Sequence, residues 1–273
     1  MTADDKPIEA KDIEEYVNTQ DDFGLELRVL RACKEREFVV SHGGTYEDRV
    51  TGKTRQYDLR VSGESQNRSV QMPVECKSLK ESHPLVVLRV PRTTSESYWE
   101  IVLHHDIDAL RGTCRSLHVN SPGDFCKAGE PVGKAMRQIG RKNGVLTGGR
   151  DAEVFDPWSQ ALSSAYDLIA SAVSGRLDRP WFCSIVMPTL VISNSMLWTV
   201  DYDANGVPSA PKQVNECTYY IGKQYEIPHP KYGTVRHTIS HLHVFTFDGF
   251  VKQLGRLYSN SKYWDLLFPE GSL

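Results

Sequence analysis

The sequence predicts an α/β protein, in which strands and amphipathic helices share one large body. Two segments alternate apolar and polar residues, as strands do, and two others repeat apolar residues at helical spacing. The strand patterns cover residues 55–60 and 70–77, and the helical patterns cover residues 22–35 and 156–175. With 273 residues, 40% hydrophobic and 25% charged, the chain is long enough for one large domain or for a core with an addition.

The first helix is expected over residues 22–35, with Asp21 or Asp22 as its N-cap and basic residues toward its end. At about 100° per residue, Glu26 falls in the middle of the apolar stripe of this helix. A buried carboxylate without a partner is costly, so Glu26 is expected to meet a metal or a base. The alternatives are an ordinary ion pair, or a helix end at which Glu26 reaches water.

A hairpin and a second strand follow this helix. The turn signal Thr51-Gly52-Lys53 precedes the strand that carries Asp58, and the next strand covers residues 70–77. Because side chains alternate along a strand, Glu75 and Lys77 share a face of the second strand. If both strands pack their apolar faces on the core, Asp58 and Glu75 meet on the opposite face. The alternative is an ordinary half-exposed sheet with charged outer residues.

The order of these elements resembles that of the PD-(D/E)XK nuclease superfamily: a helix with Glu26, a hairpin with Asp58, and a strand with Glu75 and Lys77. Tyr57 stands where the name of the motif has proline, a position that varies in the superfamily.

The resemblance covers about residues 22–92 and implies a restriction-endonuclease-like core. In this fold a central mixed β-sheet is flanked by helices. The core is expected at about 22–175, with a C-terminal β/α extension at about 176–273 inside one domain that starts at residue 21. The resemblance also implies dependence on Mg²⁺ or Mn²⁺ and hydrolysis of phosphodiester bonds, usually in DNA.

These residues support such chemistry directly. Asp58 and Glu75 would hold one or two divalent ions through oxygen, with the main-chain carbonyl of Cys76 as a further ligand. Lys77 would orient the attacking water or stabilise the transition state, and Glu26 would complete the metal shell directly or through water. The Cys76 thiol is on the apolar face, which favours a core position over a nucleophile.

The rest of the chain shows weaker patterns. Residues 106–150 are expected to be loop-rich, with a short helix near 133–139. The helix over 156–175 is expected to begin at the N-cap Asp156. His241 and His243 share a strand face and could bind zinc, but their aromatic neighbours favour packing. Further strands are expected at 85–90, 98–103 (or a helix start), 181–187, 196–201, 217–221 and 239–247, and a helix at 248–258.

Charge is distributed unevenly along the chain, whose net charge is −3. Residues 1–20 form an acidic head, whose two acid-x-Lys triplets lie outside any strand pattern. Segment 127–150 has six basic residues against Glu130 alone and is rich in glycine. A flexible basic segment suits phosphate contacts, although a solvated surface loop has the same composition. The candidate nucleic-acid-binding residues are Lys134, Arg137, Arg141 and Lys142.

The sequence predicts a cytoplasmic protein. No apolar stretch is long enough to cross a membrane, and the N-terminus has no signal-peptide pattern. The six scattered cysteines are expected to be reduced core residues. The expected function is a Mg²⁺-dependent endonuclease acting on double-stranded DNA, in restriction or phage defence, with a homodimer or higher homo-oligomer expected by analogy. The alternatives are a catalytically degenerate module that binds nucleic acid or protein, and a hydrolase of RNA or nucleotides.

Overall fold

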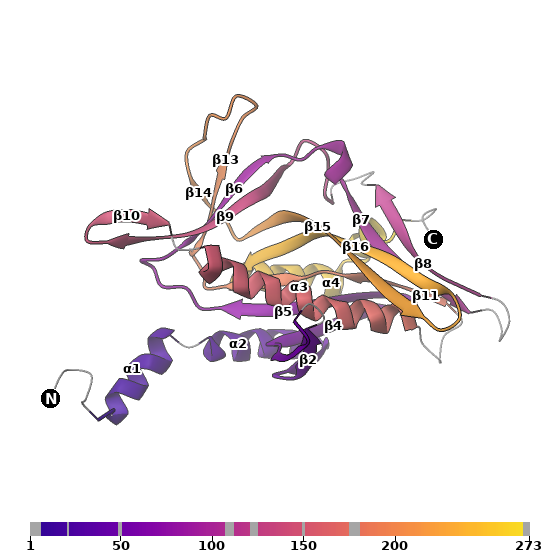
Figure 1. Ribbon diagram of the computed structural model, residues 1–273, viewed down its shortest axis with the longest axis horizontal. Coiled ribbons are helices and arrows are strands. Elements are labelled where there is room, and N and C mark those ends of the chain that lie inside the picture. The colour runs from indigo at the N-terminus through magenta and orange to yellow at the C-terminus, as the bar shows by residue number, and fades with distance from the viewer. Residues whose placement is uncertain are drawn as a thin grey trace.

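The computed structural model describes residues 7–20, 22–48, 51–106, 112–120, 125–148, 151–174 and 181–269 (Figure 1). The predicted fold class is confirmed, because a large sheet of parallel and antiparallel strands is flanked by helices.

The helices are α1 (Ala10–Gln20), α2 (Phe23–Lys34), α3 (Asp151–Ser174), α4 (Phe247–Ser259), α5 (Ser261–Leu267) and the 3-10 turn η2 (Thr94–Glu96). The strands of the large sheet are β1 (Val39–His42), β4 (Leu59–Ser65), β5 (Arg68–Lys77), β6 (Leu85–Pro91), β7 (Tyr98–Asp106), β8 (Gly112–Asn120), β9 (Pro131–Lys142), β10 (Val145–Gly148), β11 (Trp181–Val186), β12 (Thr189–Ile192), β13 (Leu197–Asp201), β14 (Lys212–Gln213), β15 (Glu216–His229) and β16 (Gly233–Thr246). A separate hairpin pairs β2 (Thr45–Asp48) with β3 (Lys53–Gln56).

Strand β5 is the centre of the large sheet. One edge of β5 pairs with β4 in antiparallel fashion, with Leu59 opposite Val74. The other edge pairs in parallel with β11 at residues 68–71 and with β12 at residues 74–77. Beyond this point the sheet divides into two branches, because β11 continues to β7 and β8, whereas β12 continues to β16 and β15 (Figure 1). Strands from residues 176–273 therefore lie directly beside the strand with Glu75 and Lys77.

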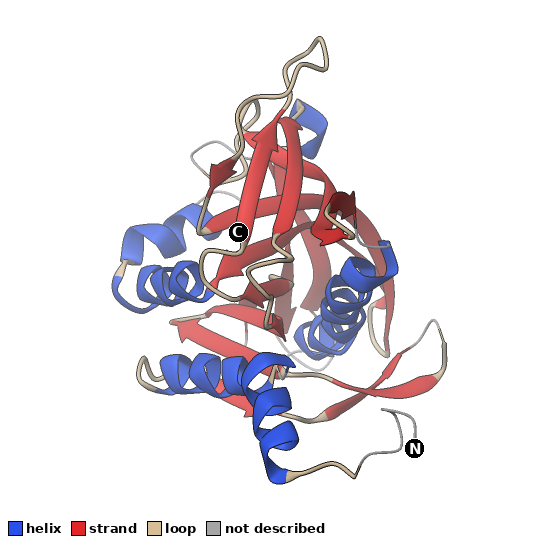
Figure 2. Ribbon diagram, turned by 90° about the vertical axis from the view of Figure 1, so that its left-hand side faces the viewer, coloured by secondary structure: helices blue, strands red, loops and turns tan. Residues whose placement is uncertain are grey.

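Helices cover both faces of the sheet around β5 (Figure 2). On one face, α2, α4 and α5 pack in a core with the apolar residues of β4 and β5, including Leu25, Met72 and Phe250, which are at most 2% exposed. On the other face lies α3, to which Arg60 of β4 donates hydrogen bonds at Ser164 and Asp167. Because side chains alternate along β5, Glu75 points to the α3 face and Cys76 to the α2 face.

The prediction for residues 106–150 is wrong, because β8, β9 and β10 occupy most of the segment and its described residues contain no helix before α3. Two of its glycines, Gly133 and Gly140, lie in β9 where neighbouring side chains leave no room for a Cβ atom, whereas Gly129 and Gly144 lie in turns with positive φ angles. A Cβ atom at Gly133 would lie 2.7 Å from Val87, and one at Gly140 would lie 2.4 Å from the His83 ring. The β9–β10 hairpin projects beyond the rest of the sheet (Figure 1).

Three predicted element boundaries are also wrong. The strand expected over 55–60 is interrupted, since β3 ends at Gln56 and β4 begins at Leu59. Helix α3 begins at Asp151, so Asp156 is inside it. Helix α4 was expected to be capped by Asp248, but it begins at Phe247 and is capped by Thr246, whose Oγ1 accepts a hydrogen bond from the Gly249 N–H. Asp21, one of the two expected caps of α2, lies outside the described residues.

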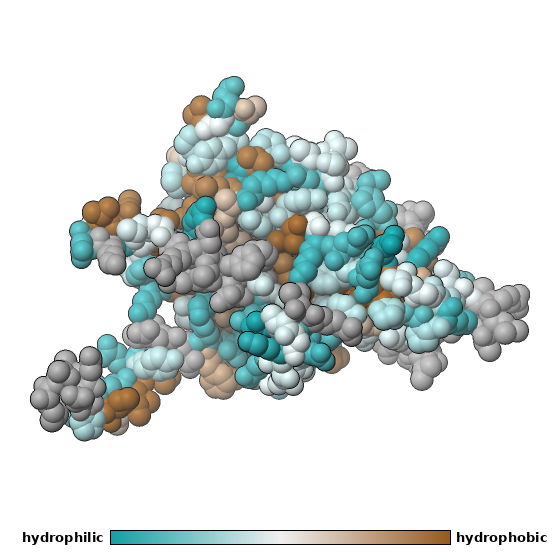
Figure 3. Space-filling model, in the orientation of Figure 1, coloured by the Kyte–Doolittle hydropathy of each residue, from teal (hydrophilic) through white to brown (hydrophobic). Residues whose placement is uncertain are grey.

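The N-terminal helix α1 projects from the body, and apolar side chains gather on it (Figure 3). Ile13, Tyr16 and Val17 of α1 are each more than half exposed. Within the described ranges, no helix is both long and apolar enough to cross a membrane.

Candidate functional site

The bend between β3 and β4 places Asp58 at the end of the β4–β5 hairpin. Leu59 lies opposite Val74, so Asp58 is next to Glu75 across the hairpin. The backbone N–H of Cys76 donates a 2.7 Å hydrogen bond to Asp58 Oδ2, which fixes the orientation of this carboxyl group. The two acids that strand alternation predicted to meet are therefore neighbours, although Asp58 belongs to a bend and not to a regular strand.

Asp58 and Glu75 form a buried, hydrogen-bonded carboxyl pair. Glu75 is 4% exposed. Burial is the main cause that raises the pKa of Asp58 to about 6, and the hydrogen bond from Cys76 opposes this effect. Burial and the neighbouring Asp58 charge raise the pKa of Glu75 further. Two carboxylates this close cannot both be ionised cheaply, so the pair holds a proton at neutral pH unless a cation replaces it.

Lys77 is bound by Asp22, the residue at the N-terminus of α2. Its ammonium Nζ donates a 2.7 Å hydrogen bond to Asp22 Oδ2, and the Ser78 N–H donates to Asp22 Oδ1. The Asp22 side chain makes no capping hydrogen bond to α2. Asp22 holds the N-cap position of α2, as predicted, but its side chain connects the start of α2 to the end of β5.

Glu26 has a histidine partner. Its Oε2 lies 2.8 Å from His42 Nε2, and both side chains are mostly buried. The Glu26 charge contributes to the raised pKa values of Asp58 and Glu75, so it lies in the same electrostatic environment. The Glu26 side chain thus lies beside the carboxyl pair and contacts His42. This contact corresponds to the alternative in which Glu26 forms an ion pair and does not bind a metal.

Tyr46 completes the surroundings of the pair on the α3 side. Burial, followed by the nearby charge of Glu75, raises the pKa of its hydroxyl group to about 12. The hydroxyl donates to the main-chain oxygen of Gln160 in α3 at 3.4 Å. Neither Tyr46 nor His42 was predicted for the site. Nothing in the local sequence marks them, because their partners are distant in the chain.

The donor set fits a hard divalent cation only in part. Among the described residues, no three His, Cys, Asp or Glu side chains converge as a metal site. Two carboxyl groups do meet, and Mg²⁺ often binds through one or two carboxylates, with water and substrate phosphate completing its shell. The backbone of Cys76 adjoins Asp58, whereas burial raises the pKa of its thiol, which lies in the core as predicted.

The predicted nucleic-acid-binding residues lie on β9 and not on a loop. Lys134 forms an ion pair with Glu96 and lies over the Tyr220 ring. Arg141 donates to the main-chain oxygen of Gly144, and Arg137 also has an interaction partner. The side chain of Lys142 lies outside the described residues. Lys134 and Arg141 therefore use part of their hydrogen-bonding capacity within the protein.

The fold and the site define a mixed α/β protein with a buried carboxyl pair and an adjacent lysine at the end of a central hairpin. No family model, curated protein or solved structure compared with the chain matches it.

Proposed function

We propose that the protein is a divalent-metal-dependent nuclease that hydrolyses phosphodiester bonds in DNA. The observation that carries this proposal is the Asp58–Glu75 carboxyl pair, which is buried, hydrogen-bonded and next to Lys77. A buried acid pair is costly to ionise, and a bound cation offsets this cost. Such pairs are typical of sites in which carboxylates bind Mg²⁺ beside a phosphate ester.

Asp58 and Glu75 would hold the cation, together with the Cys76 carbonyl oxygen. When bound, Mg²⁺ or Mn²⁺ lowers the pKa of water and neutralises charge that develops on the phosphoryl oxygens. Binding requires the carboxyl pair to lose its proton to solvent, so affinity for the cation is expected to rise with pH. The Cys76 N–H keeps Asp58 oriented in both protonation states.

Lys77 supplies a positive charge beside the pair. Its side chain is 42% exposed, and its contact with Asp22 keeps the ammonium group near the end of β5. From this position Lys77 would donate to a phosphate oxygen or to the attacking water. Glu26 and His42 flank the pair, and the Glu26 charge adds to the attraction for a cation.

A role in the cytoplasm, in restriction or phage defence, belongs to the same proposal. All six cysteines are buried and free, which supports a reducing compartment. Cleavage of both DNA strands by a homodimer remains a prediction from the resemblance.

The test is cleavage of duplex DNA with Mg²⁺ by the full chain and by Asp58→Asn and Lys77→Met. Removal of either group should reduce the rate by about 10²-fold or more, because each acts on charge that develops in the transition state. Matched controls are Glu226→Gln and Lys212→Met, which change exposed side chains of β15 and β14.

Equal cleavage by the wild-type protein and by both site variants would contradict the proposal. Parallel assays with single-stranded RNA separate a DNA enzyme from an RNA hydrolase. DNA binding with a steep salt dependence but no cleavage would favour the degenerate binding module.

A further inference from the structure

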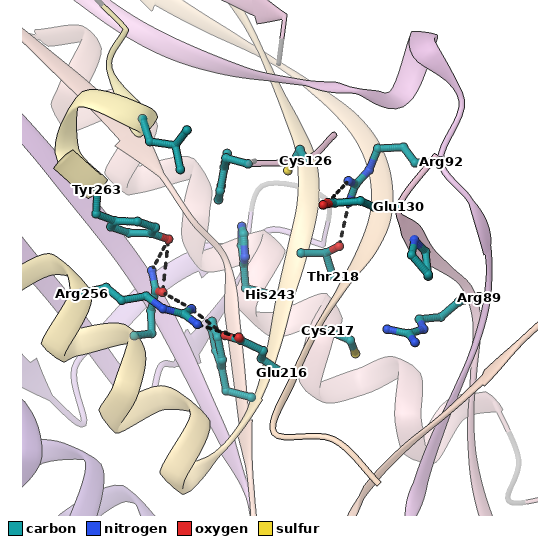
Figure 4. Close-up of a pocket in the computed structure, with 15 residues that line it drawn as sticks. Arg89, Arg92, Cys126, Glu130, Glu216, Cys217, Thr218, His243, Arg256 and Tyr263 are labelled. Atoms are coloured by element: carbon teal, nitrogen blue, oxygen red, sulfur yellow. Dashed lines mark hydrogen bonds and ion pairs between the residues drawn. The ribbon is translucent and has the colours of Figure 1, made fainter. Parts of the chain in front are cut away.

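A second site lies on the other helical face of the sheet. A cavity of about 370 Å³ is enclosed by the end of β6, residues 125–131, the start of β15, the end of β16 and the helices α4 and α5 (Figure 4). Its volume is within the usual range of about 300–1,000 Å³ for small-ligand sites.

Arg92 lines this cavity and is 4% exposed. Its Nη1 donates to the Lys127 carbonyl oxygen at 3.2 Å, and its Nη2 donates to Thr218 Oγ1 at 2.9 Å. Its buried Nε has no hydrogen-bond partner among the described residues. The nearest carboxylate oxygen, on Glu130, is 3.8 Å from Nη1, which is beyond hydrogen-bond distance. Arg92 is therefore a buried cation with incomplete compensation.

The two other arginines of the cavity differ from Arg92 in this respect. Arg256 makes two 2.7 Å hydrogen bonds to the Glu216 carboxylate. Arg89 makes a similar fork to Asp201, with distances of 2.7 and 3.1 Å. Both guanidinium groups thus have a bidentate carboxylate partner, and Arg92 has none at hydrogen-bond distance among the described residues.

Aromatic rings provide flat surfaces in the same cavity. The rings of Phe125 and His243 are stacked with centroids 6.0 Å apart and planes 15° apart. His243 is in turn stacked with Phe245 at 6.3 Å and 10°. Burial, followed by the charge of Arg92, lowers the pKa of His243 to about 4, so its ring is neutral at pH 7. A neutral ring stack beside a buried guanidinium group is chemically suited to a flat, negatively charged ligand.

We propose that this cavity binds an aromatic oxyanion, that is, a flat ring that carries a phosphate or a carboxylate group. The oxyanion would bind Arg92 and the Thr218 hydroxyl group, and the ring would pack on Phe125, His243 and Phe245. Glu130 has a side chain that is 48% exposed, so it can turn to solvent and leave its place near Arg92 to the ligand. This inference does not depend on nuclease activity, because it concerns different residues on the opposite face of the sheet.

Isothermal titration calorimetry of the full chain at low ionic strength tests this site. The ligands are adenosine 5′-monophosphate and nicotinate, which carry phosphate and carboxylate respectively, with adenosine and inorganic phosphate as controls for the ring and the anion alone. At least one of the two aromatic oxyanions should bind about tenfold or more tightly than both controls, since the charge and the ring contribute together.

Two variants locate the bound ligand. Arg92→Lys should weaken binding about tenfold, because an ammonium group cannot reproduce the guanidinium fork. Glu130→Gln should strengthen binding severalfold by removing the competing carboxylate, and its half-exposed position makes it tolerant of substitution. Glu226→Gln on the distant part of β15 is the matched control and should bind as the wild type does.

Absence of binding by both aromatic oxyanions at millimolar concentration would overturn the proposal. Binding that is unchanged in both Arg92→Lys and Glu130→Gln would also overturn it, because the ligand would then be elsewhere. If Arg92→Lys is unfolded by circular dichroism, the Glu130→Gln result decides.

Discussion

The carboxyl pair and the arginine cavity bury charges of opposite sign on opposite faces of one sheet. Asp58 and Glu75 compensate for each other by sharing a proton, and burial raises the pKa of both. Arg92 cannot become neutral by a corresponding loss of a proton, because a guanidinium group keeps its proton in proteins. The carboxyl pair should therefore respond to pH and to cations, whereas the arginine cavity should respond to anions and little to pH.

Each site is also bordered by a glycine at which an added Cβ atom would clash with a neighbouring residue. A Cβ atom at Gly249 in α4 would lie 2.0 Å from the Asn215 carbonyl oxygen, next to Glu216 of the arginine cavity. A Cβ atom at Gly44 would lie 2.2 Å from the Tyr57 hydroxyl oxygen, beside the Asp58 bend. The added Cβ atom would clash with backbone at Gly249, near the cavity. At Gly44, near the carboxyl pair, it would clash with the end of a side chain.

The largest expected effect separates these two glycines. Gly249→Ala should lower the free energy of unfolding by about 3 kcal/mol, because backbone must move to admit the methyl group. Gly44→Ala should cost only about 1 kcal/mol, because the Tyr57 ring can shift. Urea denaturation measures both values.

The matched control is Gly255→Ala in the same helix as Gly249, where no atom lies within 4 Å of the added Cβ. It should raise stability by about 0.5–1 kcal/mol through helix propensity. A loss for Gly44→Ala as large as that for Gly249→Ala would show that the Tyr57–Asp58 bend is as rigid as the α4 contact.

The next expected effect is a gain in stability at the carboxyl pair. At pH 7 without divalent cations, Glu75→Gln should raise the free energy of unfolding by about 1–3 kcal/mol. The unfolded chain ionises Glu75 at this pH, and folding must return a proton to it, whereas glutamine avoids this cost. Urea denaturation in a chelator is the measurement, with Glu226→Gln as the control that should change stability by less than about 0.5 kcal/mol. A destabilised Glu75→Gln protein would mean that the ionised carboxylate has a compensating partner.

The two sites also differ in how much of them the sequence could predict. Asp58 and Glu75 are close in the chain, and strand alternation was enough to bring them together. Their partners were not predictable in this way, because the contacts of Glu26 with His42 and of Asp22 with Lys77 join helix α2 to strands and do not follow from strand alternation. Local periodicity identified α2 and β5, but it did not predict β1, and the hairpin signalled by Thr51-Gly52-Lys53 is the separate β2–β3 hairpin, which ends at Gln56.

The arginine cavity had no such local signal. Arg92, Thr218 and His243 come from β-strands or their ends that are separated in sequence, and the pairing of β6, β9, β15 and β16 within one branch of the sheet brings them together. Glycine-rich composition between 127 and 150 suggested a loop, but Gly133 lies within β9, where Val87 approaches it closely. Both the cavity and the environment of Gly133 depend on packing between segments that are distant in sequence, and a single sequence does not show such packing.

The smallest expected effect, measured per pH unit, is the pH dependence that distinguishes the pair from the cavity. Folding raises the pKa values of Asp58 and Glu75, so their stabilising contribution is complete below about pH 4, near the ordinary carboxyl values. It is lost as pH rises toward about 6 for Asp58 and further for Glu75. The wild-type protein in a chelator should thus lose stability between pH 5 and pH 8, by at most about 1.4 kcal/mol per pH unit for each proton.

Urea denaturation across this range should give a flatter profile of stability against pH for Glu75→Gln. The profile of the wild type with Mn²⁺ should also be flatter at the alkaline end, because the cation replaces the proton. The Glu130→Gln profile should follow that of the metal-free wild type, because the arginine cavity holds no comparable proton. Parallel profiles for wild type and Glu75→Gln would show that Glu75 is ionised in the folded protein, and the contrast between the two sites would then fail.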